Sequence, residues 1–129
     1  MSDPERVHHV LVITDDLEAT RDFYCDVLGF EVADKPPLPF EGVWLSLGGD
    51  ACVHLAERVS YEQTLETMGL SRLEGPVDHV AFRRTDYDAL AARLEEAGVE
   101  TATNVVPGLF RQLYVTDPNG VRVELNFFV

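Results

Sequence analysis

The stretch VHHVLVITDDLEATRDFYCDVLGFE, residues 7–31, decides the architecture, because a second version of it follows 70 residues later. That second version, VDHVAFRRTDYDALAARLEEAGVE, begins at Val77. VHHV in the first copy aligns with VDHV in the second, and LGF aligns with AGV when the offset is shortened by one residue. Repetition at a fixed offset is typical of a duplicated structural unit. The sequence therefore predicts two copies of one module.

Each copy has the pattern of a strand, a helix and three further strands. In the first copy, residues 7–13 are strand-like and residues 16–28 are helical, with an aspartate as N-cap and Gly29 as the stop. A hairpin follows over 42–47 and 51–57. The second copy predicts a helix from residue 85 or 86 to about 97 and strands over 99–105, 109–116 and 121–128. We predict an α+β fold of two tandem βαβββ modules, 7–57 and 77–129, in one domain; the connector 58–76 can hold a short helix.

Charge and composition restrict the partners. The 129 residues carry a net charge of −13, which disfavours nucleic acid and anionic membrane surfaces. No apolar run approaches the roughly 20 residues that a membrane span needs. The N-terminus MSDPERV lacks the pattern of a signal peptide, and Cys25 and Cys52 form no CxxC pair. We expect a cytoplasmic protein with reduced thiols and a small-molecule partner.

Strand alternation selects four polar residues for one face. In the last strand Val121, Val123 and Leu125 form an apolar face that should pack on helices, so Glu124 points to the opposite, polar face. The repeat places three histidines on the equivalent face: His9, His54 and His79. The same alternation turns His8 to the other side of the sheet, as a bystander that faces the helices or another subunit.

The turn Asp117-Pro-Asn-Gly predicts the neighbours of Glu124. It suits a type I turn followed by a glycine in the left-handed region, which places Tyr114 opposite Glu124. The offset of 70 maps Tyr114 onto Trp44, beside His54. Imidazole and carboxylate together suit Fe, Mn, Co, Ni or Zn. We therefore expect one divalent transition metal, bound by His9, His54, His79 and Glu124.

These segments resemble a known family. HHVLVITDDLEATRDFYCDVLGFEV, DHVAF and LYVTDPNGVRVELNFF look like the vicinal oxygen chelate superfamily of glyoxalases, bleomycin resistance proteins and extradiol dioxygenases. The resemblance implies a glyoxalase-like fold, in which the modules form a cupped mixed sheet with a divalent metal at its base. It also implies a homodimer as the expected assembly, since cups formed across a two-fold axis are common in this family.

The resemblance leaves three functions open. The first is a metal-dependent lyase or isomerase of glyoxalase I type, in which the metal stabilises an enediolate of a substrate with vicinal oxygens. The second is an Fe(II) extradiol ring-cleaving dioxygenase, in which His54 acts as an acid–base group and does not bind the metal. The third is a non-catalytic, drug-binding protein, which the metal ligands disfavour. We place the first ahead because the dioxygenase motif is incomplete at residues 105–107.

Residues with proposed roles beyond the metal belong to the same site. Tyr114 and His54 are the candidate catalytic residues, and Tyr114 is suited to donate a hydrogen bond to a developing oxyanion. Trp44 is a candidate pocket wall, and Arg83 and Arg111 are candidates to receive an anionic substrate. A glutathione cosubstrate is disfavoured, because Ile13 and Arg58 stand where bacterial glyoxalase I has an arginine and an asparagine.

Overall fold

The fold was analysed in a computed structural model that describes residues 6–128. Residues 1–5, which carry most of the N-terminal stretch used above, and Val129, the last residue of the predicted second module, lie outside the described residues. The first half contains β1 (Val10–Thr14), α1 (Leu17–Asp22), a π-helical turn η1 (Phe23–Val27), β2 (Glu31–Ala33), β3 (Gly42–Leu47) and β4 (Asp50–Glu57). The second half contains β5 (His79–Arg83), α3 (Tyr87–Glu96), β6 (Ala102–Val106), β7 (Phe110–Thr116) and β8 (Arg122–Phe128).

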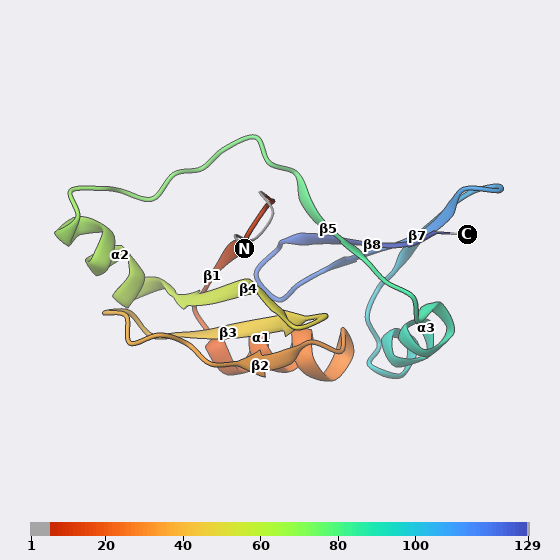
Figure 1. The fold of residues 1–129 in the computed structure, drawn as a ribbon, viewed down its shortest axis with the longest axis horizontal. Helices are drawn as coiled ribbons and strands as arrows, with labels where there is room; N and C mark the ends of the chain where they lie inside the picture. Colours follow the sequence, from red (N-terminus) through yellow and green to blue (C-terminus); the bar gives the residue numbers. More distant parts are fainter. Residues whose placement is uncertain (1–5, 129) are drawn as a thin grey trace, which may run out of the picture.

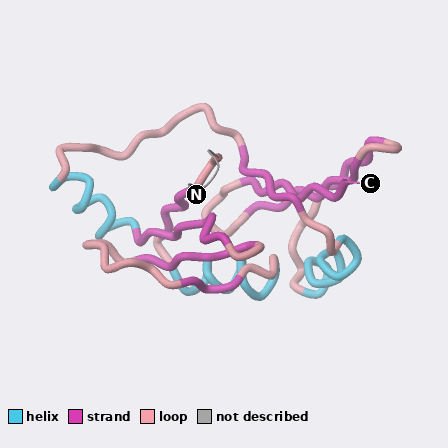
Figure 2. The backbone as a smooth tube through the Cα atoms, viewed as in Figure 1, coloured by secondary structure: helices cyan, strands magenta, loops and turns pink. Residues whose placement is uncertain are grey.

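Two four-stranded mixed sheets have the same topology. Their strand orders are β1-β4-β3-β2 and β5-β8-β7-β6, with the first pair of each parallel and the remaining pairs antiparallel. Figure 1 shows the sheets next to each other, with α1 and α3 on the same side of them, and Figure 2 shows the strands in one colour. The predicted glyoxalase-like α+β fold with two modules is confirmed.

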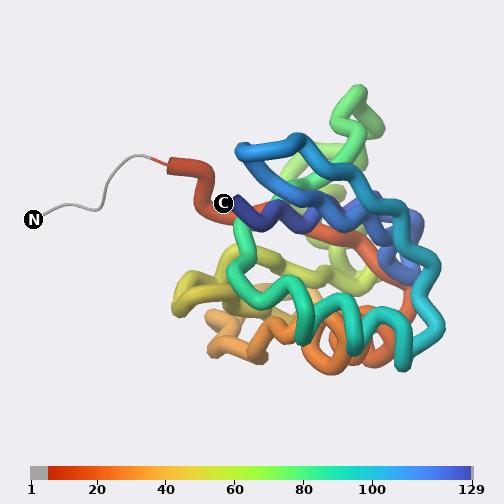
Figure 3. The backbone as a smooth tube through the Cα atoms, turned by 90° about the vertical axis from the view of Figure 1, so that its right-hand side faces the viewer, coloured from red at the N-terminus to blue at the C-terminus, as the bar shows by residue number. Residues whose placement is uncertain are grey.

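The connector between the sheets does contain a helix, α2 (Arg58–Thr67). The Glu57 side chain caps it by accepting hydrogen bonds from the backbone N–H groups of Val59 and Ser60. Beyond α2 the chain runs as a long arc to β5, on the side of the molecule opposite α1 and α3 (Figures 1 and 3). No helix among residues 6–128 combines the length and the apolar character that crossing a membrane requires.

One apolar core unites the two halves. Side chains from both sheets and from the helices beneath them form a single buried cluster. Its fully buried members include Tyr24, Leu28, Leu55, Leu90 and Leu125. The alternate apolar side chains of β8 point into this core, as the alternation of its sequence predicts.

Polar links tie the turn of the second module to the helix of the first. The Tyr24 hydroxyl donates to Asp117 Oδ2 at 3.0 Å, and the Asn119 side chain donates to Thr20 Oγ1 at 2.9 Å. Asp117 Oδ1 accepts from the backbone of Asn119 and Val121, which closes the predicted turn. The polar residues of this turn therefore have a structural task in joining the modules.

Candidate metal centre

His54 lies at the middle of an aromatic column on the face of the first sheet that points away from the core. Trp44 pairs with His54 across β3 and β4, and their rings stack with centroids 3.7 Å apart. The His9 ring stacks on the other side of His54 at 3.9 Å. His54 Nε2 lies 2.9 Å from the carbonyl oxygen of Ala51, which can only accept a hydrogen bond. His54 therefore carries its proton on Nε2 and keeps the lone pair of Nδ1 for a ligand.

His8 does not lie on the far side of the sheet, and the bystander expectation is wrong on this point. Its Nδ1 lies 2.9 Å from His9 Nδ1, and its ring centroid is 6.2 Å from that of His54. The reason is that β1 begins only at Val10, so the alternation of a strand does not govern the two histidines before it. The ligand atoms of His8, His9 and His54 all lie within 4.8 Å of one another.

The surroundings of His9 and His54 favour the neutral form of both imidazoles. Burial, followed by the charge of His8, lowers the pKa of His9. Burial, followed by the charge of His9, lowers the pKa of His54. A neutral imidazole is the form that binds a metal ion. The column therefore presents histidines in the protonation state that a transition metal needs.

The second sheet holds the other two predicted ligands as a pair. His79 Nε2 lies 3.5 Å from Glu124 Oε1, while its Nδ1 lies 2.9 Å from Asp78 Oδ2. The hydrogen bond from His79 and the one from Arg122 lower the pKa of Asp78, so this carboxylate accepts the Nδ1 proton. His79 Nε2 then faces a carboxylate oxygen of Glu124, an arrangement that a proton or a bound cation between the two atoms satisfies. A carboxylate behind the imidazole is the usual support of a metal-binding histidine.

A ladder of polar side chains continues from this pair. Glu124 Oε2 accepts from Asn126 at 2.8 Å, Gln112 donates to Asn126 at 3.0 Å, and the Tyr114 hydroxyl donates to Gln112 at 3.1 Å. Tyr114 pairs directly with Glu124, as the turn predicted. The neighbouring Glu124 carboxylate, followed by burial, raises the pKa of Tyr114, so its phenol stays protonated and able to donate. Sequence reasoning missed Gln112 and Asn126, although both continue the polar phase of their strands.

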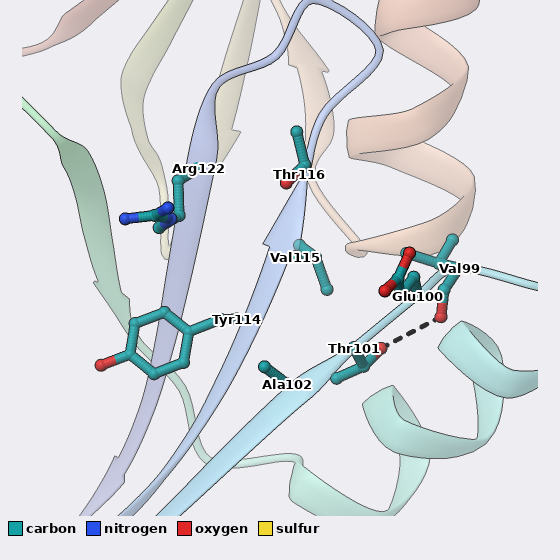
Figure 4. A pocket seen from close by; sticks show the side chains of 8 residues that line it. All are labelled: Val99, Glu100, Thr101, Ala102, Tyr114, Val115, Thr116 and Arg122. Carbon is teal, nitrogen blue, oxygen red and sulfur yellow. Dashed lines mark hydrogen bonds between the residues drawn. The ribbon is translucent and has the colours of Figure 1, made fainter.

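Two hollows border these half-sites. One, of about 350 Å³, lies beside Tyr114 and Arg122, with Val99–Ala102 on its other side. Figure 4 shows that the Tyr114 hydroxyl points away from Val99 and Thr101, so this hollow does not receive the hydroxyl. The other, of about 510 Å³, lies between β1 and α2, and is lined by Leu11, Ile13, Tyr61 and Leu65, among others. Leu11 is level with His54 in the sheet, so this apolar hollow borders the histidine column.

The four predicted ligands form two pairs within one chain. Within residues 6–128, the group of His8, His9 and His54 is the one set of three or more potential ligands whose donor atoms all lie within 4.8 Å. His79 and Glu124 therefore make a separate half-site.

The structure does not bring the two predicted arginines together with these pairs. Arg111 lies level with Phe127 on the core side of its sheet, whereas Tyr114 lies level with Glu124 on the other side. Arg83 shares the face of His79 but sits at the other end of β5, about 13 Å along the strand.

Fold and half-sites together define a class of protein with duplicated βαβββ modules and paired histidine and carboxylate donors. The sequence profile of the Glyoxalase/Bleomycin resistance protein/Dioxygenase superfamily matches residues 6–125. The chain belongs to this superfamily.

Its relatives carry several different activities in their names. It is 30% identical to the uncharacterized protein YaeR of Escherichia coli, over 94% of this chain and 95% of that one. It is 28% identical to Glyoxylase I 4 of Arabidopsis thaliana, over 92% and 68% of the two chains. It is also 28% identical to mitochondrial methylmalonyl-CoA epimerase of Bos taurus, over 93% and 73%.

Solved structures support the fold. A lactoylglutathione lyase from Agrobacterium tumefaciens aligns with a TM-score of 0.73 at 22% identity, over 97% of this chain and 95% of that chain. TnmS3, an antibiotic binding protein from Streptomyces, aligns with a TM-score of 0.67 at 27% identity over the full length of both chains. Superfamily membership thus limits the chemistry to this group of activities without selecting one of them.

Proposed function

We propose that this protein is a divalent-metal-dependent lyase or isomerase of glyoxalase type that acts on a small substrate with vicinal oxygens. It works in the cytoplasm as a homodimer, in which His9 and His54 of one subunit bind the metal together with His79 and Glu124 of the partner subunit. Cys25 and Cys52 form no disulfide with each other, which supports the compartment. The metal is Zn, Ni, Co, Mn or Fe, for which imidazole and carboxylate ligands are suited.

The observation that carries this proposal is the complementarity of the two half-sites. The first sheet offers a lone pair on His54 beside His9, and in the second His79 Nε2 faces Glu124 Oε1 at 3.5 Å. Each half-site contains only part of a metal coordination shell. Equivalent strands of the two sheets present the two donor pairs on equivalent faces. A second copy of the chain, related by a two-fold axis, can therefore place its own donor pair opposite the pair that is incomplete.

The residues around the half-sites suit this chemistry. When bound, the metal supplies Lewis-acid polarisation of two neighbouring substrate oxygens. Tyr114, kept protonated by its surroundings, donates a hydrogen bond to the oxygen on which charge develops. Glu124, held by Asn126, accepts a proton from the substrate carbon or holds its position as a ligand. Trp44, stacked on His54, and the hollow between β1 and α2 offer apolar surface for a substrate beside the metal donors.

A ring-cleaving dioxygenase is the second candidate, and the state of His54 favours it. A buried histidine with a lowered pKa and one nitrogen fixed by a carbonyl is suited to act as a general base. In that case His9, His79 and Glu124 alone form the two-histidine, one-carboxylate set of an Fe(II) site.

A test of the shared site uses two complementary variants. One chain carries His9→Ala and His54→Ala, and the other carries His79→Ala and Glu124→Gln; neither alone should bind zinc tightly. After co-refolding, half of the dimers are mixed and each mixed dimer regains one intact site, so about a quarter of the wild-type zinc content should return. No recovery, with mixed dimers verified by native mass spectrometry, would exclude a site shared between subunits.

The reaction class needs a separate assay. Metal-loaded protein is offered a 2-oxoaldehyde thiohemiacetal in one experiment and catechol, with an oxygen electrode, in another. Conversion of the first without oxygen uptake supports the lyase or isomerase. Oxygen consumption with catechol in the Fe(II) form would instead establish the ring-cleaving activity.

A further inference from the structure

A third hollow, away from the metal half-sites, brings together three of the five arginines of the second module. It has a volume of about 390 Å³ and lies where β5 ends beside the last residues of β8. Three arginines, Arg83, Arg84 and Arg111, line it together with Thr85 and the rings of Tyr87, Phe127 and Phe128. This concentration is unexpected in a chain whose net charge is −13.

Two of these arginines have no acidic partner among residues 6–128. Arg84 is buried and neutralised, because its guanidinium donates to both oxygens of Asp86. Arg83 and Arg111 form no salt bridge with any described residue, although seven of the ten lysines and arginines do. Two like charges that border one hollow repel each other unless an anion lies between them.

Aromatic rings hold both free guanidinium groups. The Arg111 guanidinium lies 3.6 Å from the centroid of the Tyr87 ring, and that of Arg83 lies 4.6 Å from the Phe128 ring. Tyr87 in turn contacts Phe127 edge to face at 5.0 Å. A guanidinium that lies over a ring still has N–H groups at its rim, and these can make a bidentate contact with an oxyanion.

We propose that this hollow binds an oxyanion, a phosphate or carboxylate group attached to an apolar moiety, independently of the metal. The two stacked arginines hold the oxyanion, and the surrounding rings accommodate the apolar part. Arg111 reaches the hollow from the core side of the sheet and Arg83 from the face of His79, about 13 Å along β5 from His79, so a ligand there does not compete for Tyr114 or Glu124. The proposal therefore does not depend on the reaction that the metal centre performs.

The test uses metal-free protein, so that anions cannot bind at a metal. Isotope-labelled full-length chain is titrated with phenyl phosphate and, separately, with benzoate, while backbone amide shifts are followed by NMR. Saturable shifts are expected at Thr85, Tyr87, Arg111 and Phe127. Tighter binding of phenyl phosphate identifies a phosphorylated ligand class, and tighter binding of benzoate identifies a carboxylate.

Variants separate the hollow from general charge effects. Arg83→Ala and Arg111→Ala should each weaken the better probe about tenfold or more, since each removes a charge-assisted pair of hydrogen bonds. Arg21→Ala, which removes an equal charge from a surface pair with Asp22, is the matched control and should leave affinity unchanged. Absence of saturable shifts with both probes, or equal weakening in the Arg21 control, overturns the proposal.

Discussion

At the scale of single residues, the orientation of the histidine pair His8 and His9 is set by contacts with neighbouring rings. His9 stacks on His54, while His8 touches His9 through Nδ1. Only His9 has an equivalent in the second module that is also a histidine, since His8 corresponds to Asp78. Asp78 contacts His79 Nδ1 in the same manner as His8 contacts His9. The first residue of each pair therefore orients the second.

This comparison predicts different effects of the two substitutions. His9→Ala should abolish zinc binding, because it removes a metal donor. His8→Ala should weaken zinc affinity about tenfold, the effect expected when a group that orients a ligand is lost. Competition with a chromophoric chelator measures both affinities. Equal loss in the two variants would make His8 a ligand itself.

His54 separates the two candidate enzymes. If it is a metal ligand, His54→Gln should reduce zinc affinity tenfold or more, because one inner donor is lost. Trp44 supports the ring by stacking, and the substitution to glutamine retains a polar side chain of similar length. Metal content and affinity are measured against the wild type. Unchanged affinity together with lost turnover would place the ring-cleaving dioxygenase first.

At the scale of elements, the link between α1–η1 and the β7–β8 turn holds the modules together. Tyr24 is fully buried, and its hydroxyl donates to Asp117, which also organises the turn. In the sequence, this turn belongs to the segment LYVTDPNGVRVELNFF, which resembles the vicinal oxygen chelate superfamily. In the structure, Asp117 and Asn119 contact the first module instead of the metal donors.

Removing this hydroxyl should destabilise the protein. Tyr24→Phe leaves a buried carboxylate oxygen without its donor, and we expect a loss of about 1–3 kcal/mol in the free energy of unfolding. Urea denaturation measures it. Tyr61→Phe is the matched control, because no hydrogen bond from the Tyr61 hydroxyl occurs within residues 6–128, and it should change stability by less than about 0.5 kcal/mol. Similar losses in both variants would contradict the assigned role.

The same tyrosine predicts a dependence on alkaline pH. Burial, followed by the Asp117 carboxylate, raises the pKa of Tyr24 well above its usual range. The unfolded chain releases this proton near pH 10, whereas the folded chain keeps it. The contribution of the Tyr24 hydroxyl to the free energy of unfolding is therefore complete below about pH 10 and is lost as the pH rises further. The stability difference between wild type and Tyr24→Phe should narrow from pH 9 to pH 11.

At the scale of the whole molecule, the proposed metal site shared between subunits predicts that folding stability is coupled to assembly. A metal that binds only the folded dimer stabilises it by about 2.7 kcal/mol at a concentration one hundred times its Kd. We expect zinc to raise the melting temperature by several degrees and the melting temperature of the zinc form to increase with protein concentration. Calorimetry at several protein concentrations measures both effects, and the variant with His79→Ala and Glu124→Gln should show neither. A zinc effect without concentration dependence would indicate a site within one chain.

The sequence alone determined the features that depend on local periodicity and turn chemistry. The 70-residue repeat predicted both modules, and the DPNG turn predicted that Tyr114 faces Glu124. Register and strand phase follow from neighbours along the chain, so a single sequence contains them.

The tertiary structure decided what depends on contacts between distant segments. His8 joins His9 because the first strand starts at Val10, three residues later than its pattern predicts. The separation of the ligands into two pairs and the link from Tyr24 to Asp117 depend on how the two modules pack against each other, and the hollow around Arg83 and Arg111 depends on how distant segments of the second module come together. The sequence pattern does not predict that packing, because it is set by the fit of residues far apart along the chain. The Arg84 side chain on the Leu28 carbonyl, 56 residues apart, and Tyr24 with Asp117, 93 residues apart, are two examples.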